Sequence, residues 1–192
     1  RKDLGLAPVV YIEKWLAAWV EEFGVDGFRC DTAKHVDGYR WKELKDVCKT
    51  ALENWRKSSR ATGDAKNWDE DFWMTGECFP WYIGNTGFYG IGFDSMIDFS
   101  YNSGSGRTPD IGDWAGRANS LNGAPDDGQN ALAYVSSHDT SLHRPGDMKT
   151  LGTNFLLLPG QVQIFYGDET GRPNGDGGSD ATQGTRSDFN WD

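Results

Sequence analysis

Acidic side chains in this sequence fall where buried strands are predicted to end. The segment 24–36, GVDGFRCDTAKHV, starts like a core strand and then places Arg29 and Asp31 at its end. Glu77 follows the apolar stretch FWMTG, and Asp139 follows ALAYVSSH. Because the carboxyl ends of strands form the active face of parallel α/β folds, three carboxylates are expected to converge there beside an arginine.

Two carboxylates that face each other suit the hydrolysis of a glycosidic bond. One must be ionised to attack the anomeric carbon, and the other must hold a proton for the leaving oxygen. Strand alternation places Arg29 and Asp31 on one face, where the guanidinium favours an ionised Asp31. Glu77 precedes Cys78 and Phe79, and an apolar setting of this kind favours the protonated acid.

Each acid also has a plainer interpretation when it is taken alone. An acid at a strand end often caps the next helix, and Asp31 before Thr32 could be such a cap. The joint pattern favours a site, because clustered acids repel one another unless they serve chemistry or bind a metal. Asp168 and Glu169, at the end of a further predicted strand, are weaker candidates.

Hydrophobic periodicity predicts the elements that position these residues. Helices are predicted over 8–23, 40–55, 111–121 and 148–158, and strands over 25–31, 72–79, 93–101, 131–139 and 161–169. Four tryptophans on the apolar faces of the first two helices are predicted to be core residues: Trp15, Trp19, Trp41 and Trp55. The alternation of strands and helices is compatible with two architectures, a doubly wound sheet and part of a β/α barrel. The absence of a G-x-G-x-x-G motif after any strand favours the barrel.

The composition is that of an acidic globular chain. Of the 192 residues 37% are hydrophobic and 25% are charged, with a net charge of −10. This charge disfavours nucleic acids and membranes as partners, since nucleic acids and anionic membranes need basic patches. The 3 cysteines contain no C-x-x-C pair, which disfavours zinc and predicts buried thiols. The chain begins without a Met or a signal peptide and is interpreted as part of a longer protein.

Three motifs in register resemble signature regions of the α-amylase family of glycoside hydrolases. They are GFRCDTAKHV, GECF and SSHD, and FWMTGECF, QVQIFYGDE and GTRSDFNW favour the bacterial periplasmic type. The resemblance implies an α/β fold, a partial TIM (β/α)8 barrel with strands four to eight of the catalytic domain. Residues 1–192 would be the C-terminal portion of that domain. The first three strands, the B domain and the C-terminal β-domain would be absent, and the fragment alone would be inactive.

The resemblance also implies a role for each residue of the motifs. Asp31 would be the nucleophile that forms a covalent glycosyl-enzyme, Glu77 the general acid and then base, and Asp139 the stabiliser of the cationic transition state. The implied substrate-binding residues are Arg29, Lys34, His35 and His138. The implied substrate is an α-glucan or maltooligosaccharide, and the implied location is periplasmic or secreted.

Calcium is the cofactor that the resemblance implies for the complete enzyme, held in part by the backbone carbonyl of His35. None is expected with these residues alone, because most calcium ligands would lie in the missing segments. Chloride is not expected, because Ser137 stands where chloride-dependent relatives carry an asparagine.

The leading hypothesis is retaining cleavage of internal α-1,4-glucosidic bonds of starch or maltodextrins. Transglycosylation and α-1,6 cleavage share the same catalytic trio, so they stay open. A non-catalytic carbohydrate-binding relative is disfavoured because all three acids are present. A metal-dependent hydrolase, with ligands among His35, His138, Asp31 and Asp139, is disfavoured because no H-x-H or H-E-x-x-H pair occurs.

Overall fold

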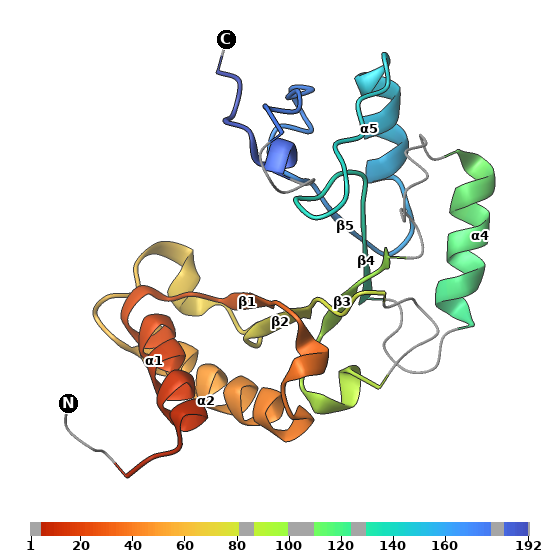
Figure 1. Cartoon of the computed structure of the whole chain (residues 1–192). Helices are drawn as coiled ribbons and strands as arrows, with labels where there is room; N and C mark the ends of the chain where they lie inside the picture. The colour runs from red at the N-terminus through yellow and green to blue at the C-terminus, as the bar shows by residue number, and fades with distance from the viewer. Residues whose placement is uncertain (1–4, 81–86, 100–109, 124–129, 178–182, 192) are drawn as a thin grey trace. The chain divides into compact units, whose positions relative to one another are not determined.

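A computed structural model describes residues 5–80, 87–99, 110–123, 130–177 and 183–191 (Figure 1). The strands are β1 Gly27–Cys30, β2 Trp73–Gly76, β3 Ser95–Ile97, β4 Ala131–Tyr134 and β5 Gln161–Gln163. The α-helices are α1 Pro8–Phe23, α2 Gly38–Lys57, α4 Ile111–Asn122 and α5 Met148–Leu156. Short 3₁₀ helices are η1 Ala33–His35, η2 Gly63–Asn67, η3 Tyr89–Ile91 and η5 Gln183–Arg186.

The strands form a parallel sheet in the order β1-β2-β3-β4-β5. This order confirms the predicted α/β fold and decides between the two architectures that the sequence left open. A doubly wound sheet reverses its strand order at a switch point, whereas strands that follow one another in chain order form a barrel wall. Between β2 and β3 the described residues contain η3 and no α-helix, consistent with the absence of a helical pattern there.

The chain divides into two compact units, which are described separately. The N-terminal unit comprises Arg1–Cys78 and Gly87–Ser95, and the C-terminal unit comprises Phe79–Thr86 and Met96–Asp192. The first contains β1, β2, α1 and α2, and the second contains β4, β5, α4 and α5. The chain passes from one unit to the other within β3.

The core of the N-terminal unit is built on the predicted apolar face of α2. Figure 1 shows α1 and α2 side by side along one face of β1 and β2. The buried residues of α2 include Trp41, Leu44, Cys48, Ala51 and Leu52. Phe72, just before β2, and Met74, within β2, are fully buried in the same unit. Burial of this apolar area is the main source of stability for the sheet edge that carries the first two predicted site acids.

The prediction that Trp15 and Trp19 are core residues is wrong. Their side chains are 58% and 46% exposed, whereas Trp41 is buried as predicted and Trp55 is half-buried. The helix α1 buries only Glu13 and Val20, because among the described residues it packs against α2 along one side. Helical periodicity identifies an apolar face but does not say whether a neighbouring element covers that face.

The end of α1 at Gly24 combines two backbone requirements. Gly24 has a φ of 69°, and its N–H donates to the carbonyl of Val20 over 2.9 Å. A Cβ atom at Gly24 would lie 2.3 Å from the Trp55 ring. Glycine therefore provides both the left-handed turn and the close approach of the two helices.

We expect Gly24→Ala to lower the free energy of unfolding by about 2–4 kcal/mol, as the sum of left-handed strain and overpacking against Trp55. Urea denaturation of the full-length protein measures the loss. The matched control is Gly63→Ala, since Gly63 has a φ of 59° but open space around its Cβ position. That control should lose only about 1–2 kcal/mol. Equal losses in the two variants would contradict the role of Trp55.

The C-terminal unit has its own core around β4. Ala133, Phe155 and Leu158 form one buried cluster, which brings α5 onto the sheet. The same unit contains a buried ion pair, in which Arg117 of α4 contacts Asp98 over 2.7 Å and both side chains are buried. This pair ties α4 to the residue that follows β3, since removing one partner would leave an unpaired buried charge. Among the described residues, no helix has the length and apolar character needed to cross a membrane.

Candidate active site

Asp31 follows the last residue of β1, and Arg29 holds it from within the strand. The guanidinium Nη1 of Arg29 contacts Oδ1 of Asp31, which confirms that the two side chains share one face. Cys30 between them points to the interior and is buried. Asp31 is solvent-exposed, with a side-chain exposure of 62%. The predicted nucleophile is therefore oriented by a cation and accessible to a ligand.

Glu77 follows β2 directly and is fixed to the end of β1 by three hydrogen bonds. Its N–H donates to the carbonyl of Cys30 over 2.8 Å, and its carbonyl accepts from the N–H of Ala33 over 2.7 Å. Its carboxylate Oε2 accepts from the N–H of Thr32 over 2.8 Å. Glu77 is only 8% exposed. The parallel pairing of β1 and β2 thus brings the segments of Asp31 and Glu77 together, as the sequence predicted.

Thr32 contributes to the site, although the sequence indicated it only as the residue that follows Asp31. It has a φ of 47°, which is unusual for a β-branched residue. This left-handed conformation allows its N–H to reach the carboxylate of Glu77, so the backbone strain serves the placement of the second acid. Asp31 is not the N-cap of η1, because Thr32 occupies that position. The plainer interpretation of Asp31 as a cap is therefore wrong.

Lys34 and His35 lie in η1, immediately after this strained residue. Both are exposed, and the N–H of His35 donates to the carbonyl of Thr32 over 2.9 Å. The short helix therefore presents two basic side chains beside the loop that carries Asp31. Trp81 and Tyr82, which follow Glu77 in a glycine-rich aromatic segment, lie outside the described residues. Phe88 packs against Phe93.

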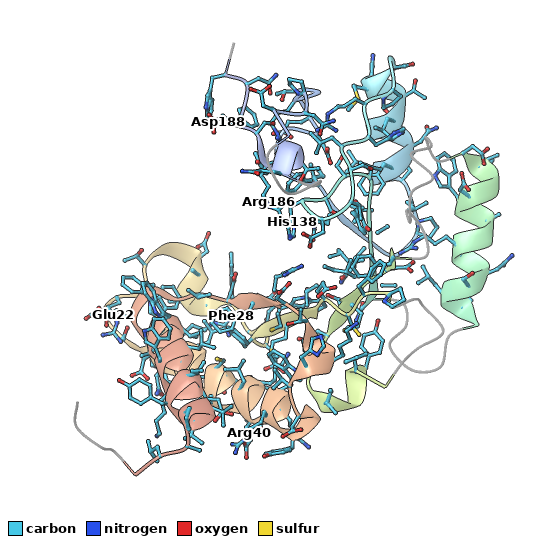
Figure 2. The ribbon with its side chains drawn as sticks, viewed as in Figure 1. Glu22, Phe28, Arg40, His138, Arg186 and Asp188 are labelled. Carbon is cyan, nitrogen blue, oxygen red and sulfur yellow. The ribbon has the colours of Figure 1, made fainter. Side chains whose placement is uncertain are left out.

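Asp139 belongs to the C-terminal unit, in the loop after β4. Both oxygens of its carboxylate are held: Oδ1 contacts Nη2 of Arg186 at 3.0 Å, and Oδ2 contacts Nε2 of His138 at 2.9 Å. Figure 2 shows His138 and Arg186 close together in this unit. Asp139 stays exposed on its remaining side, with 54% of its side chain accessible. Arg186 was not among the residues predicted from the sequence.

Ser137 shapes the loop that presents Asp139. Its Oγ accepts the N–H groups of Asp139 over 3.3 Å and of Thr140 over 3.2 Å, and it pairs with the Thr140 hydroxyl at 2.8 Å. The small hydroxyl side chain therefore closes a tight turn that directs the carboxylate outward. The weaker candidate Asp168 makes structural contacts. It is buried and ion-paired with Arg144 over 2.8 Å, and it accepts the N–H of Phe165.

Cys30 and Cys78, the cysteines next to the site, are buried thiols, as predicted. Burial, with a smaller contribution from Cys48, raises the pKa of the Cys30 thiol to about 12. Burial likewise raises the pKa of Cys48 to about 12 and that of Cys78 above its ordinary value. Neutral thiols in these positions are poor nucleophiles, so the chemistry of the site rests on its carboxylates.

Comparisons with known proteins identify relatives of this chain. The chain is 44% identical to the periplasmic α-amylase of Escherichia coli over 97% of its length, and 30% identical to an α-amylase of Streptomyces lividans over 90%. The chain is homologous to the α-amylase family of glycoside hydrolases. It spans 27% and 20% of these two relatives, so it corresponds to a part of each. No protein-family model matches the chain.

Solved α-amylase structures share the fold. The enzyme of Geobacillus thermoleovorans, solved with acarbose, superposes with a TM-score of 0.67, covering 96% of this chain and 40% of that one. An Anoxybacillus α-amylase superposes with a TM-score of 0.65 over 95% of this chain and 39% of that one. The sequence identities are 20% and 19%, so these matches establish the fold alone. The five strands of this α-amylase homologue therefore form part of a barrel.

The described residues do not account for the calcium that the family resemblance implies. No group of three His, Cys, Asp or Glu side chains within the described ranges is arranged to hold a metal ion. The carbonyl of His35 would provide one oxygen, whereas calcium takes about six to eight. The described residues do not fit the ion by themselves.

Proposed function

We propose that this chain carries the catalytic carboxylates of an enzyme that cleaves internal α-1,4-glucosidic bonds of starch and maltodextrins with retention of configuration. The observation that carries the proposal is the bond from the Thr32 N–H to the Glu77 carboxylate, directly beside Asp31. It joins the buried carboxyl group of Glu77 to the residue after the accessible Asp31, and a retaining double displacement uses two neighbouring carboxyl groups. The family assignment from the E. coli relative supports the same reaction class.

In the first step, an Asp31 carboxylate oxygen attacks the anomeric carbon of the glucosyl unit. The bond from that carbon to the leaving oxygen breaks, and Glu77 donates its proton to this oxygen. Arg29 keeps Asp31 oriented for the attack. In the second step Glu77 takes a proton from water, the water oxygen attacks the anomeric carbon, and Asp31 leaves as a carboxylate.

Asp139 would stabilise the positive charge that develops on the sugar ring, with its two oxygens held by His138 and Arg186. Lys34 and His35 would contact the leaving-group side, because both are exposed next to Asp31. A carbohydrate substrate is supported by solved relatives of the same fold, which include a Nostoc debranching enzyme soaked with acarbose. Calcium in the complete enzyme and export to the periplasm or medium are parts of the proposal, the latter supported by the periplasmic relative.

The test is an assay of the full-length protein on 4-nitrophenyl maltoheptaoside, starch and pullulan, with proton NMR of the first products. We expect internal cleavage of the α-1,4 substrates and α-anomers as first products. The Asp31 and Glu77 carboxyl groups should lie about 5–5.5 Å apart in a ligand-bound structure. Cleavage of only the α-1,6 bonds of pullulan would favour the debranching alternative. Transfer to added maltose in place of hydrolysis would favour transglycosylation, and β-anomers would contradict the retaining mechanism.

A further inference from the structure

Arg172 is a buried cation in the C-terminal unit that the proposed chemistry does not use. Its exposed fraction is 0%, which makes it the largest fully buried side chain among the described residues. Its guanidinium donates to backbone carbonyls and one hydroxyl, and none of these partners within the described ranges is a carboxylate. A buried charge of this kind is costly unless its hydrogen bonds are satisfied, so its placement needs a reason.

The guanidinium joins two segments that are distant in sequence. Its Nε donates to the carbonyl of Tyr166 over 3.1 Å, in the loop after β5. Its Nη2 donates to the carbonyl of Thr185 over 3.0 Å, and its Nη1 donates to the carbonyl of Ser187 over 3.0 Å and to the Ser187 hydroxyl. Four of its five N–H groups are thereby used. Its flat face lies 3.9 Å from the centre of the Tyr166 ring, which adds a cation–π contact.

The two residues that Arg172 holds in the C-terminal segment, Thr185 and Ser187, flank Arg186. The Thr185 hydroxyl donates to the carbonyl of His138 over 2.7 Å. Arg186, between the two anchored residues, reaches Oδ1 of Asp139 at 3.0 Å. The turn held by Arg172 therefore touches the His138–Asp139 loop twice, once through a backbone carbonyl and once through the carboxylate.

We propose that Arg172 is a positioning residue, whose guanidinium fixes the turn Thr185–Ser187 so that Arg186 holds the carboxylate of Asp139. This inference rests on the proposed function, in which Asp139 stabilises the transition state. Thr185 and Arg186 end the short helix η5, and Arg186 is exposed, so the direction of its side chain depends on how firmly this backbone is held. Anchoring both of its neighbours fixes the backbone from which Arg186 projects before the substrate arrives, and such preorganisation is how a site gains rate.

The surrounding backbone leaves room for a guanidinium. Gly167 has a φ of 81°, and a Cβ atom there would lie 2.5 Å from the Arg172 side chain. A lysine at 172 would have three donors on one nitrogen, so it cannot reproduce the four bonds that three guanidinium nitrogens make to Tyr166, Thr185 and Ser187. Arg172→Lys therefore keeps the charge and removes the fork geometry on which the proposal depends.

The experiment is a double-mutant cycle in the full-length protein, measured on 4-nitrophenyl maltoheptaoside. We expect Arg172→Lys to lower kcat about 10- to 100-fold while KM changes less than about threefold, because a displaced transition-state group costs rate more than ground-state binding. In an Arg186→Gln background the same substitution should lower kcat less than about twofold further, because its effect passes through Arg186. Multiplicative effects on kcat would overturn the proposal.

The matched control is Arg117→Lys, which changes another buried arginine of the same unit. Arg117 bonds to Asp98 and to the carbonyls of Pro159 and Ala131, so its loss should lower Tm without a change in kcat of the folded fraction. If Arg172→Lys does not fold, Thr185→Val removes the hydroxyl bond to His138 and keeps the backbone carbonyl to which Arg172 donates. That variant should lower kcat about 3- to 10-fold, in the range of one lost hydrogen bond, and unchanged kinetics would overturn the link.

Hydrogen exchange of the full-length protein separates this inference from the proposed function. Arg172→Lys should accelerate amide exchange in the segment 183–187, while Arg117→Lys should not. Wild-type protein that hydrolyses no α-glucan would contradict the proposed function. Faster exchange of that segment in Arg172→Lys would then still support the anchoring of the turn. Unchanged exchange would overturn the inference whether or not the protein is a glycosidase.

Discussion

The largest expected effect is the loss of α-glucan hydrolysis in Asp31→Asn, with kcat lowered about 10⁴- to 10⁶-fold in the full-length protein, as when the nucleophile of a covalent mechanism is removed. The amide retains the shape of the side chain and its position next to Arg29 but cannot attack the anomeric carbon. The measurement is the rate of nitrophenol release from 4-nitrophenyl maltoheptaoside.

A covalent label makes this prediction specific to the nucleophile. A 5-fluoro glycosyl fluoride, which forms a slowly hydrolysed glycosyl-enzyme, should label Asp31 in the wild type and leave Asp31→Asn unlabelled by mass spectrometry of peptides. The matched control is Asp26→Asn, because Asp26 is an exposed acid at the opposite end of β1. That variant should keep its kcat. Near-normal turnover by Asp31→Asn, or a label on another acid, would reject the assignment.

The second large effect is expected for Glu77→Gln, which should lower kcat on starch about 10²- to 10⁴-fold because the leaving oxygen then receives no proton. The amide oxygen can still accept the N–H of Thr32, so the local backbone should be retained. Glu70→Gln is the matched control, since Glu70 is exposed and precedes the other end of β2. Its kcat should stay at the wild-type value.

Chemical rescue distinguishes an acid/base from a residue that merely supports the fold. Glu77→Ala should release nitrophenol from an activated aryl maltooligosaccharide faster in the presence of azide. A good leaving group needs no proton, and azide replaces the water that Glu77 would activate. The product should be the α-glycosyl azide. Failure of azide to raise the rate in a folded Glu77→Ala protein would argue against the acid/base role.

Local patterns in the sequence predicted the helices and strands of the first unit and the arrangement of side chains at the end of β1. Hydrophobic periodicity placed the helices α1 and α2 and the strands that alternate with them, because these patterns depend on residues within a few positions of one another. Strand alternation placed Arg29 and Asp31 on one face and Cys30 on the other, and the ion pair and the buried thiol agree. The motifs gave the order in which the acids follow their strands.

Features that depend on contacts between segments distant in the sequence became evident only in the tertiary structure. The sheet order β1-β2-β3-β4-β5 resolved the barrel from the doubly wound sheet, since both contain the same alternation. The left-handed Thr32 donates its N–H to the carboxylate of Glu77, which lies 45 positions away in the sequence. Arg186 contacts the carboxylate of Asp139 across a sequence separation of 47 residues. Trp15 and Trp19 lie on an apolar helix face, yet both are exposed. Contacts and exposures of this kind cannot be predicted from hydrophobic periodicity, because they arise only when separate segments fold against one another.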